Sequence, residues 1–117
     1  LRDQLVKQLM IIEGRMQNWL HRYFPEFLDV FANWKGKAAI HTLRIFPLPA
    51  ETQTMTPEEI VLKWKPFIKR GVGIKRAEKL MQAANESVGL TAGTTFAKRE
   101  LASLLKQNDL YKQKVQA

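Results

Sequence analysis

Apolar residues recur at alternating intervals of four and three near both ends of the chain, and this spacing constrains the fold more than any other feature. The first seam consists of Leu5, Leu9, Ile12, Met16, Trp19 and Tyr23. The second consists of Ala97, Leu101, Leu104, Asn108, Tyr111 and Val115. Such spacing places side chains along one face of a helix. We therefore expect two long terminal helices that pair antiparallel as a coiled-coil-like stalk.

The stalk has an alternative, because each seam is shorter than the three to four heptads that identify a coiled coil. Each terminal helix could instead pack only on the central part of the chain. In the stalk interpretation, Asn108 would fix the register at some cost in stability. We expect homo-oligomer formation through the seam residues Leu5, Leu9, Ile12, Met16, Leu101, Leu104 and Tyr111.

Prolines and glycines divide the segment between the seams into short helices. Pro25 can open a helix that runs to Trp34, and Gly36 would end it. A helix over residues 37–46 should follow, and then a connection of about ten residues that begins at Pro47. No stretch of adequate length alternates with a period of two. The sequence predicts an all-α fold divided into a first stalk helix (1–24), a compact helical region (25–93) and a second stalk helix (94–117).

A strong helix start lies in the middle of this region. Thr56 can serve as N-cap, Pro57 as the first helical residue and Glu59 as the partner that closes a capping box. We expect this helix to bury Ile60, Val61, Trp64 and Phe67, with Pro66 ending or kinking it. Trp64 shares a face with the apolar residues, which favours a core position over stacking on a base. A helix over residues 74–88 should follow, and Thr94 or Thr95 should cap the last helix.

The turn before the 74–88 helix combines glycines with positive charge. Gly71 and Gly73 would allow positive φ and close approach of a ligand. The amides of residues 74–76 should be unpaired at a helix N-terminus, which favours an anion. The residues that we expect to bind nucleic-acid phosphate here are Lys69, Arg70, Gly71, Gly73, Lys75, Arg76 and Lys79.

This hairpin at residues 69–80 resembles that of helix-hairpin-helix DNA-binding modules. Those modules carry Gly-hydrophobe-Gly, then a small and an aliphatic residue, which correspond here to Gly71, Val72, Gly73, Ala77 and Leu80. The resemblance implies that the hairpin amides grip the nucleic-acid backbone without reading its sequence. The alternative is an ordinary glycine C-cap beside a solvated basic turn.

Net charge points to a polyanionic partner. The 117 residues carry a formal charge of +8 and a pI near 10.0, which favours nucleic acid first and an anionic membrane surface second. From Val61 to Leu80 there are seven Lys or Arg and one acid, Glu78. No apolar run approaches the ~18 residues of a membrane span. The absence of cysteine excludes disulfides and thiolate catalysis, and we expect a cytoplasmic protein.

Catalytic and metal-binding patterns are not evident. His21 and His41 lack the i, i+4 spacing of a helical metal pair. Capping and the helix dipole account for Glu58 and Glu59, and we interpret Glu26 and Asp29 in the same way. Ser87 and Ser103 have no evident base. We expect no catalytic residue, no metal, no cofactor and no small-molecule substrate in this segment.

Read from end to end, the chain resembles the middle of the Piv-like DNA recombinases, a family of bacterial insertion-sequence transposases whose better-known members are guided by a bridge RNA. The resemblance rests on the order of several blocks across nearly the whole chain. These blocks are Arg2-Asp3-Gln4-Leu5-Val6, Leu20-His21-Arg22-Tyr23-Phe24-Pro25-Glu26-Phe27, Gly36, Leu43, Phe46-Pro47-Leu48-Pro49, the hairpin with Ala77 and Leu80, Ala84-Asn85-Glu86-Ser87-Val88-Gly89, and the pairs Glu100-Leu101 and Leu104-Leu105.

The resemblance implies a non-catalytic position between two catalytic domains. Family members have an N-terminal RuvC-like domain with acidic ligands for a divalent metal such as Mg²⁺, and a C-terminal domain with a catalytic serine. Because both ends of the chain fall inside helical patterns, we expect a segment of such a protein, from bacterial cytoplasm, with DNA and a guide RNA as candidate partners. Two alternatives stay open: a stand-alone helix-hairpin-helix module of a repair or replication protein, and a purely oligomerising scaffold.

Overall fold

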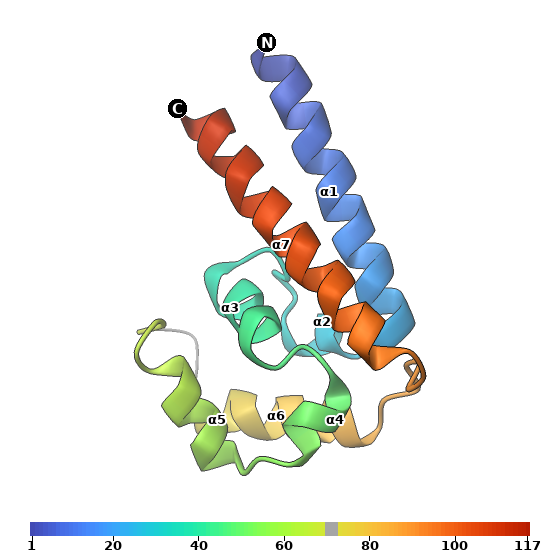
Figure 1. Cartoon of the computed structure of the whole chain (residues 1–117). Helices are drawn as coiled ribbons and strands as arrows, with labels where there is room; N and C mark the ends of the chain where they lie inside the picture. Colours follow the sequence, from blue (N-terminus) through green and yellow to red (C-terminus); the bar gives the residue numbers. More distant parts are fainter. Residues whose placement is uncertain (70–72) are drawn as a thin grey trace.

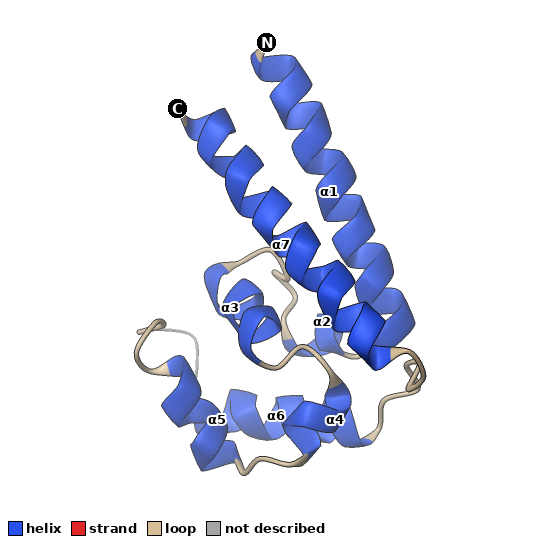
Figure 2. Ribbon diagram, in the orientation of Figure 1, coloured by secondary structure: helices blue, strands red, loops and turns tan. Residues whose placement is uncertain are grey.

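The computed structural model describes residues 1–69 and 73–117, and these residues form helices and no strand (Figure 2). The prediction of an all-α fold is therefore confirmed. The helices are α1 (Arg2–Tyr23), α2 (Phe27–Val30), α3 (Lys37–Ile45), α4 (Pro49–Gln53), α5 (Pro57–Trp64), α6 (Ile74–Asn85) and α7 (Thr94–Gln116).

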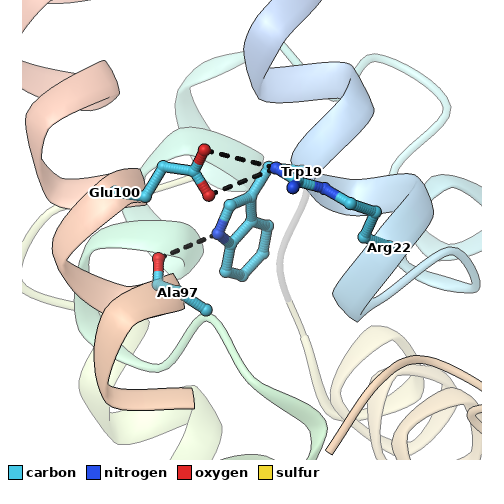
Figure 3. A network of polar contacts seen from close by, with 4 residues as sticks. All are labelled: Trp19, Arg22, Ala97 and Glu100. Atoms are coloured by element: carbon cyan, nitrogen blue, oxygen red, sulfur yellow. Dashed lines mark hydrogen bonds and ion pairs between the residues drawn. The ribbon is translucent and has the colours of Figure 1, made fainter. Parts of the chain in front are cut away.

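The two long helices lie side by side and run in opposite directions, with the N- and C-termini at the same end of the molecule (Figure 1). At that end, Arg2 Nη1 donates a hydrogen bond to Val115 O at 2.8 Å. At the other end, Trp19 Nε1 donates to Ala97 O at 2.8 Å (Figure 3). The first bond joins the start of α1 to the end of α7, and the second joins the end of α1 to the start of α7. The antiparallel register follows from these contacts, and the supercoiling of a true coiled coil stays a prediction.

Burial along the two seams increases toward the centre of the molecule. Ile12, Met16, Leu101 and Leu104 are buried, whereas Leu5, Leu9 and Tyr111 near the termini are half-buried. The inner parts of the seams are therefore covered within one chain, because α1 and α7 pack on each other and on the central helices. Asn108 is also buried in the seam. Self-association through the outer parts stays a prediction.

An ion pair flanks the buried Trp19 at the edge of the helix pair (Figure 3). Arg22 Nη2 lies 3.2 Å from Glu100 Oε1, and both side chains are about half exposed. Exposed pairs of this kind contribute about 0–1 kcal/mol to stability. The free energy that holds α1 against α7 therefore comes mainly from the buried seam.

Helix α2 is shorter than the predicted helix from Pro25 to Trp34, because the chain leaves the helical conformation at Phe31 (φ −118°, ψ 88°). The Phe31 ring is packed between Phe27, at a centroid distance of 4.8 Å, and Trp64, at 6.2 Å. This aromatic packing lies in the core, where Phe31 is buried. Tertiary packing has overridden the local preference to continue the helix.

The expected connection after Pro47 contains a helix that the prediction missed. Helix α4 begins with Pro49 in its first turn, and Leu48 N donates to Glu51 Oε1 at 3.1 Å. At its other end, Gln53 Nε2 donates to Ala84 O at 2.8 Å, which ties α4 to α6. Proline in the first turn with an acid at N3 is a recognisable start signal. The sequence predicts a connection here because Pro47 and Pro49 both stop the preceding helix.

Helix α5 begins as predicted and ends differently. Thr56 Oγ1 accepts from Glu59 N and Glu59 Oε1 accepts from Thr56 N, each at 3.2 Å, which confirms the capping box. Trp64 is fully buried and its Nε1 donates to Thr42 Oγ1 at 2.9 Å, which confirms the core position. The expectation that Phe67 is buried is wrong, because Phe67 is 60% exposed and Ile68 is buried instead. After α5 ends, Phe67 N bonds to Trp64 O in a tighter turn, which moves Phe67 off the buried face.

The loop between α6 and α7 is tied to the junction of α1 and α2. Glu26 accepts hydrogen bonds from Ser87 Oγ at 2.7 Å and from Val88 N at 2.9 Å. Leu90 N donates to Arg22 O at 2.8 Å. The interpretation of Glu26 as a first-turn acid therefore missed its tertiary role. These bonds also explain why α6 ends at Asn85 and does not reach Val88.

Two glycines of this loop have specific roles. At Gly89 an added Cβ would lie 2.2 Å from Tyr23 O, so only glycine allows the loop backbone to approach the end of α1 this closely. Gly93 is the N-cap of α7 and has φ 68°, in the left-handed region. The expected cap at Thr94 or Thr95 is therefore wrong, because both threonines lie inside the helix and neither provides a side-chain cap.

Candidate nucleic-acid interface

The predicted phosphate-binding cluster is partly outside the described residues. Arg70 and Gly71 lie outside them, so the expectations for both stay predictions. Lys69 precedes this gap, Gly73 follows it, and Lys75, Arg76 and Lys79 belong to α6. The described part of the chain therefore tests only the two sides of the hairpin.

Gly73 does not adopt the positive φ that the sequence suggested. Its backbone is extended (φ −159°, ψ −175°), a conformation that any residue can adopt. An added Cβ would meet no atom within 4 Å. Gly73 is the N-cap of α6, and N-cap residues usually lie in the extended region. Neither backbone shape nor space requires a glycine at this position.

The amides of residues 74–76, at the start of α6, have no hydrogen-bond partner among the described residues. The first backbone bond runs from Ala77 N to Gly73 O at 3.0 Å, and no side chain caps the helix. The amides of residues 74–76 therefore precede the first intrahelical bond. Of these three residues, only Arg76 lines a hollow on the protein surface.

A hollow of about 620 Å³ lies between the start of α3, the end of α5 and the start of α6. Its cationic lining residues are Lys37, Lys69 and Arg76, and none of its described lining residues is acidic. We call this site the basic hollow. Lys69 and Arg76 are among the residues predicted from the sequence, whereas Lys37 is not. Lys37 comes from a distant part of the chain and reaches the site only through the packing of α3.

The first turn of α3 also lines the basic hollow. Gly36 is the N-cap, no side chain caps the helix, and the first intrahelical bond runs from Ile40 N to Gly36 O at 3.0 Å. The amides of residues 37–39 therefore lack intrahelical partners, and these residues line the hollow. The partial positive charge of the helix start adds to that of the three cations.

The cations of α6 divide between the hollow and the outer surface. The Arg76 guanidinium lies 5.3 Å from the centroid of the Phe31 ring, a cation–π contact that orients it at the wall of the hollow. Lys75 and Lys79 are exposed and do not line the hollow. The structure thus brings Lys69 and Arg76 together with Lys37, and leaves Lys75 and Lys79 as a separate exposed pair.

None of the cations of the basic hollow has an acidic partner in the described chain. The ion pairs formed by residues 1–69 and 73–117 are Arg22–Glu100, Lys35–Glu13, Arg44–Asp109 and Lys98–Glu51. None of them includes Lys37, Lys69 or Arg76. The hollow therefore brings together three cations that have no ion-pair partner among the described residues.

Other kinds of site have less support. The described residues contain no group of three or more His, Asp or Glu side chains that could hold a metal ion. None of the described helices has the length and apolar character needed to cross a bilayer. Comparisons with known proteins gave no matching family model, no matching curated protein and no matching solved structure.

Proposed function

We propose that this chain is a non-catalytic helical segment of a transposase or site-specific DNA recombinase, and that it contacts nucleic-acid phosphate through the basic hollow. The observation that carries this proposal is the convergence of Lys37, Lys69 and Arg76 from three parts of the chain on one concave surface. Arginine, lysine and unpaired amides at a helix start are the groups that bind phosphate oxygens. DNA is the first candidate partner, and a guide RNA is the second.

The arrangement of the long helices is compatible with a linking role. The start of α1 and the end of α7 lie together, and α4, α5 and α6 lie at the opposite end of the molecule (Figure 1). Segments joined to either end would emerge side by side, and the helix pair would set their distance from the nucleic acid. The coiled-coil stalk and the association of protomers through it belong to this proposal. The resemblance of the sequence blocks supplies the class of parent protein.

The test is a charge reversal of the hollow: Lys37→Glu, Lys69→Glu and Arg76→Glu combined. The unchanged chain should bind labelled duplex DNA without sequence preference, with Kd of about 10⁻⁴ to 10⁻⁶ M at physiological salt. The triple variant should lose this binding at physiological salt and should retain measurable binding only at low salt. Its folding is expected to persist, because Lys37 and Lys69 are exposed and none of the three residues forms an ion pair with the described chain.

A matched control removes the same charge from the helix pair through Lys7→Glu, Arg99→Glu and Lys106→Glu, three exposed positions outside the hollow. Each phosphate contact contributes about 0.9 to the slope of log K against log salt for duplex DNA, so the hollow variant should show a slope lower by about 2–3. An equal loss of affinity for DNA in the hollow variant and in the control variant would mean that net charge alone drives binding. No binding by the unchanged chain at low salt would favour the oligomerising scaffold.

A further inference from the structure

Phe67 lies at the boundary between two hollows and is 60% exposed. The first is the basic hollow. The second hollow, of about 380 Å³, lies on the other side of Phe67 and extends to α7. Phe67, Ile68 and Lys37 line both. Most of this large apolar ring is exposed between two concave surfaces, while Ile68 fills the core position.

The Phe67 ring is supported by an imidazole. Its centroid lies 4.1 Å from that of His41, with 39° between the ring planes. The Nε2 atom of His41 is buried and has no hydrogen-bond partner among the described residues. Burial, together with the charge of Arg44, lowers the pKa of His41 below its ordinary value, so the imidazole is neutral at pH 7. The supporting group is therefore a flat, uncharged ring.

Positive charge surrounds Phe67 on both sides. The basic hollow provides Lys37, Lys69 and Arg76, and the second hollow adds Lys35, Arg44 and Lys112. Asp109 is the one acid among the described lining residues of the two hollows, and it is paired with Arg44. Lys35 is loosely paired with Glu13 at 3.8 Å. The cations near the ring that have no acidic partner in the described chain are thus Lys37, Lys69, Arg76 and Lys112.

We propose that Phe67 is a stacking platform for an unpaired nucleobase, and that the flanking cations hold the phosphates on either side of that nucleotide. The preferred partner is then a single-stranded nucleic acid. An exposed aromatic ring within a positively charged groove is the arrangement that binds single strands, because every base offers a flat face. In a duplex those faces are already stacked on neighbouring bases.

The two hollows have the size that the proposal requires. Pockets that bind small organic groups span about 300–1,000 Å³, and both hollows fall within this range. One hollow on each side of the ring leaves room for the sugar and phosphate that follow and precede the stacked base. This inference rests on the proposed function, in which the basic hollow binds phosphate, and it adds the class of nucleic acid.

The experiment compares three labelled probes of about 12 nucleotides, a length within the range of known single-strand sites. They are an oligo(dT) strand, a strand of abasic sites with the same phosphates, and a duplex of mixed sequence. The unchanged chain should bind oligo(dT) more tightly than the abasic strand. Phe67→Leu should weaken oligo(dT) binding roughly 5- to 150-fold, which is the effect of losing one stacked base. The same substitution should not change the affinity for the abasic strand.

Two further variants serve as controls. Phe67→Tyr keeps a ring that can stack and should retain most of the affinity for oligo(dT). Phe96→Leu removes another exposed ring, 80% exposed at the start of α7 and outside both hollows, and should change none of the affinities. Circular dichroism of Phe67→Leu should match that of the unchanged chain, because the ring is mostly outside the core.

The outcomes separate this inference from the function on which it rests. Equal affinity of the unchanged chain for oligo(dT) and the abasic strand would overturn the stacking platform, even if every variant misfolded, and would leave phosphate binding in place. An equal loss of affinity for all three probes in Phe67→Leu would also overturn the stacking platform, since the ring would then only shape the hollow. A dimer that dissociates in Phe67→Leu would assign the ring to contacts between copies. Failure of all three probes to bind the unchanged chain would contradict the proposed function itself.

Discussion

The α1–α7 pair and the basic hollow both carry cations, but only the pair covers a buried apolar seam. In the pair, Arg22 bonds to Glu100 and Lys98 bonds to Glu51 of α4, whereas other cations such as Lys7 form no ion pair with the described chain. In the hollow, Lys37, Lys69 and Arg76 have no acidic partner within the described chain. Underneath its charged edge the pair buries a continuous apolar seam, whereas the hollow is an open surface.

This difference indicates a division of labour between the two regions. Burial of apolar side chains stabilises the fold, and exposed ion pairs add little to it. Uncompensated charge raises self-repulsion and attracts a polyanion. Changes in the pair should therefore act on folding, and changes in the hollow should act on binding.

The largest effect on stability should come from the buried seam. Leu101 is 1% exposed on α7. Leu101→Ala should lower the free energy of unfolding by about 2–5 kcal/mol, because the substitution loses apolar contacts and leaves a cavity. Urea titration followed by circular dichroism measures this change. Lys37→Ala, at the exposed hollow, should stay within about 0.5 kcal/mol of the unchanged chain. Comparable losses in both variants would contradict the proposed division.

A smaller effect should depend on pH and involve Glu26, which joins the α6–α7 loop to the α1–α2 junction. Burial raises the pKa of Glu26, but the hydrogen bonds from Ser87 and Val88 outweigh it, so that the pKa lies below its ordinary value of 4.5. The unfolded chain then binds more protons than the folded chain near this pH. The stabilisation is present above pH 4.5 and is lost as the pH falls through the lowered pKa of the folded state.

Glu26→Gln removes this titration and tests the assignment. At pH 7 the variant should be less stable by about 0.5–1.5 kcal/mol, the net value of a typical hydrogen bond. The difference in the free energy of unfolding between the unchanged chain and Glu26→Gln should narrow as the pH is lowered from 5 to 3. Urea midpoints at each pH measure this difference. A difference that stays constant with pH would show that the charge of Glu26 has no part in holding the loop.

The smallest effects concern two glycines, one inside α1 and one at the start of α6. Gly14 lies inside α1, and an added Cβ would meet no atom within 4 Å. Gly14→Ala should therefore raise the free energy of unfolding by about 0.5–1 kcal/mol, because alanine restricts the unfolded chain and favours a helix. Gly73→Ala should change it by less than about 0.5 kcal/mol, since Gly73 is extended and unobstructed. A large loss of stability in Gly73→Ala would indicate that Gly73 has the positive φ expected from the sequence.

Local signals in the sequence were sufficient to predict where most of the helices lie. The seams predicted α1 and α7, the capping box at Thr56 predicted the start of α5, and the face shared with Ile60 placed Trp64 in the core. Errors occurred where a contact from elsewhere in the chain decided the backbone. The packing of Phe31 on Trp64 accompanies the early end of α2, and the bonds of Glu26 accompany that of α6.

The sequence predicted only some residues of the candidate site, because the hollow is formed by several elements that are distant in the chain. Lys69 and Arg76 stood out through the density of positive charge around them. Lys37 did not, since an exposed lysine in the first turn of a helix has no distinguishing local pattern. Phe67 was placed on the buried face of α5 by helical spacing, and the tighter turn after Trp64 moved it to the surface.

The sequence by itself determined the helical class, the two long terminal helices and the excess of positive charge, because each follows from residue type and from spacing over a few turns. The tertiary structure alone decided which cations share the basic hollow, that Phe67 is exposed beside it, and that Gly89 lacks room for a side chain beside Tyr23 O. These features depend on distances between segments far apart in the chain. Such distances are set by how the whole core packs and leave no mark on local sequence.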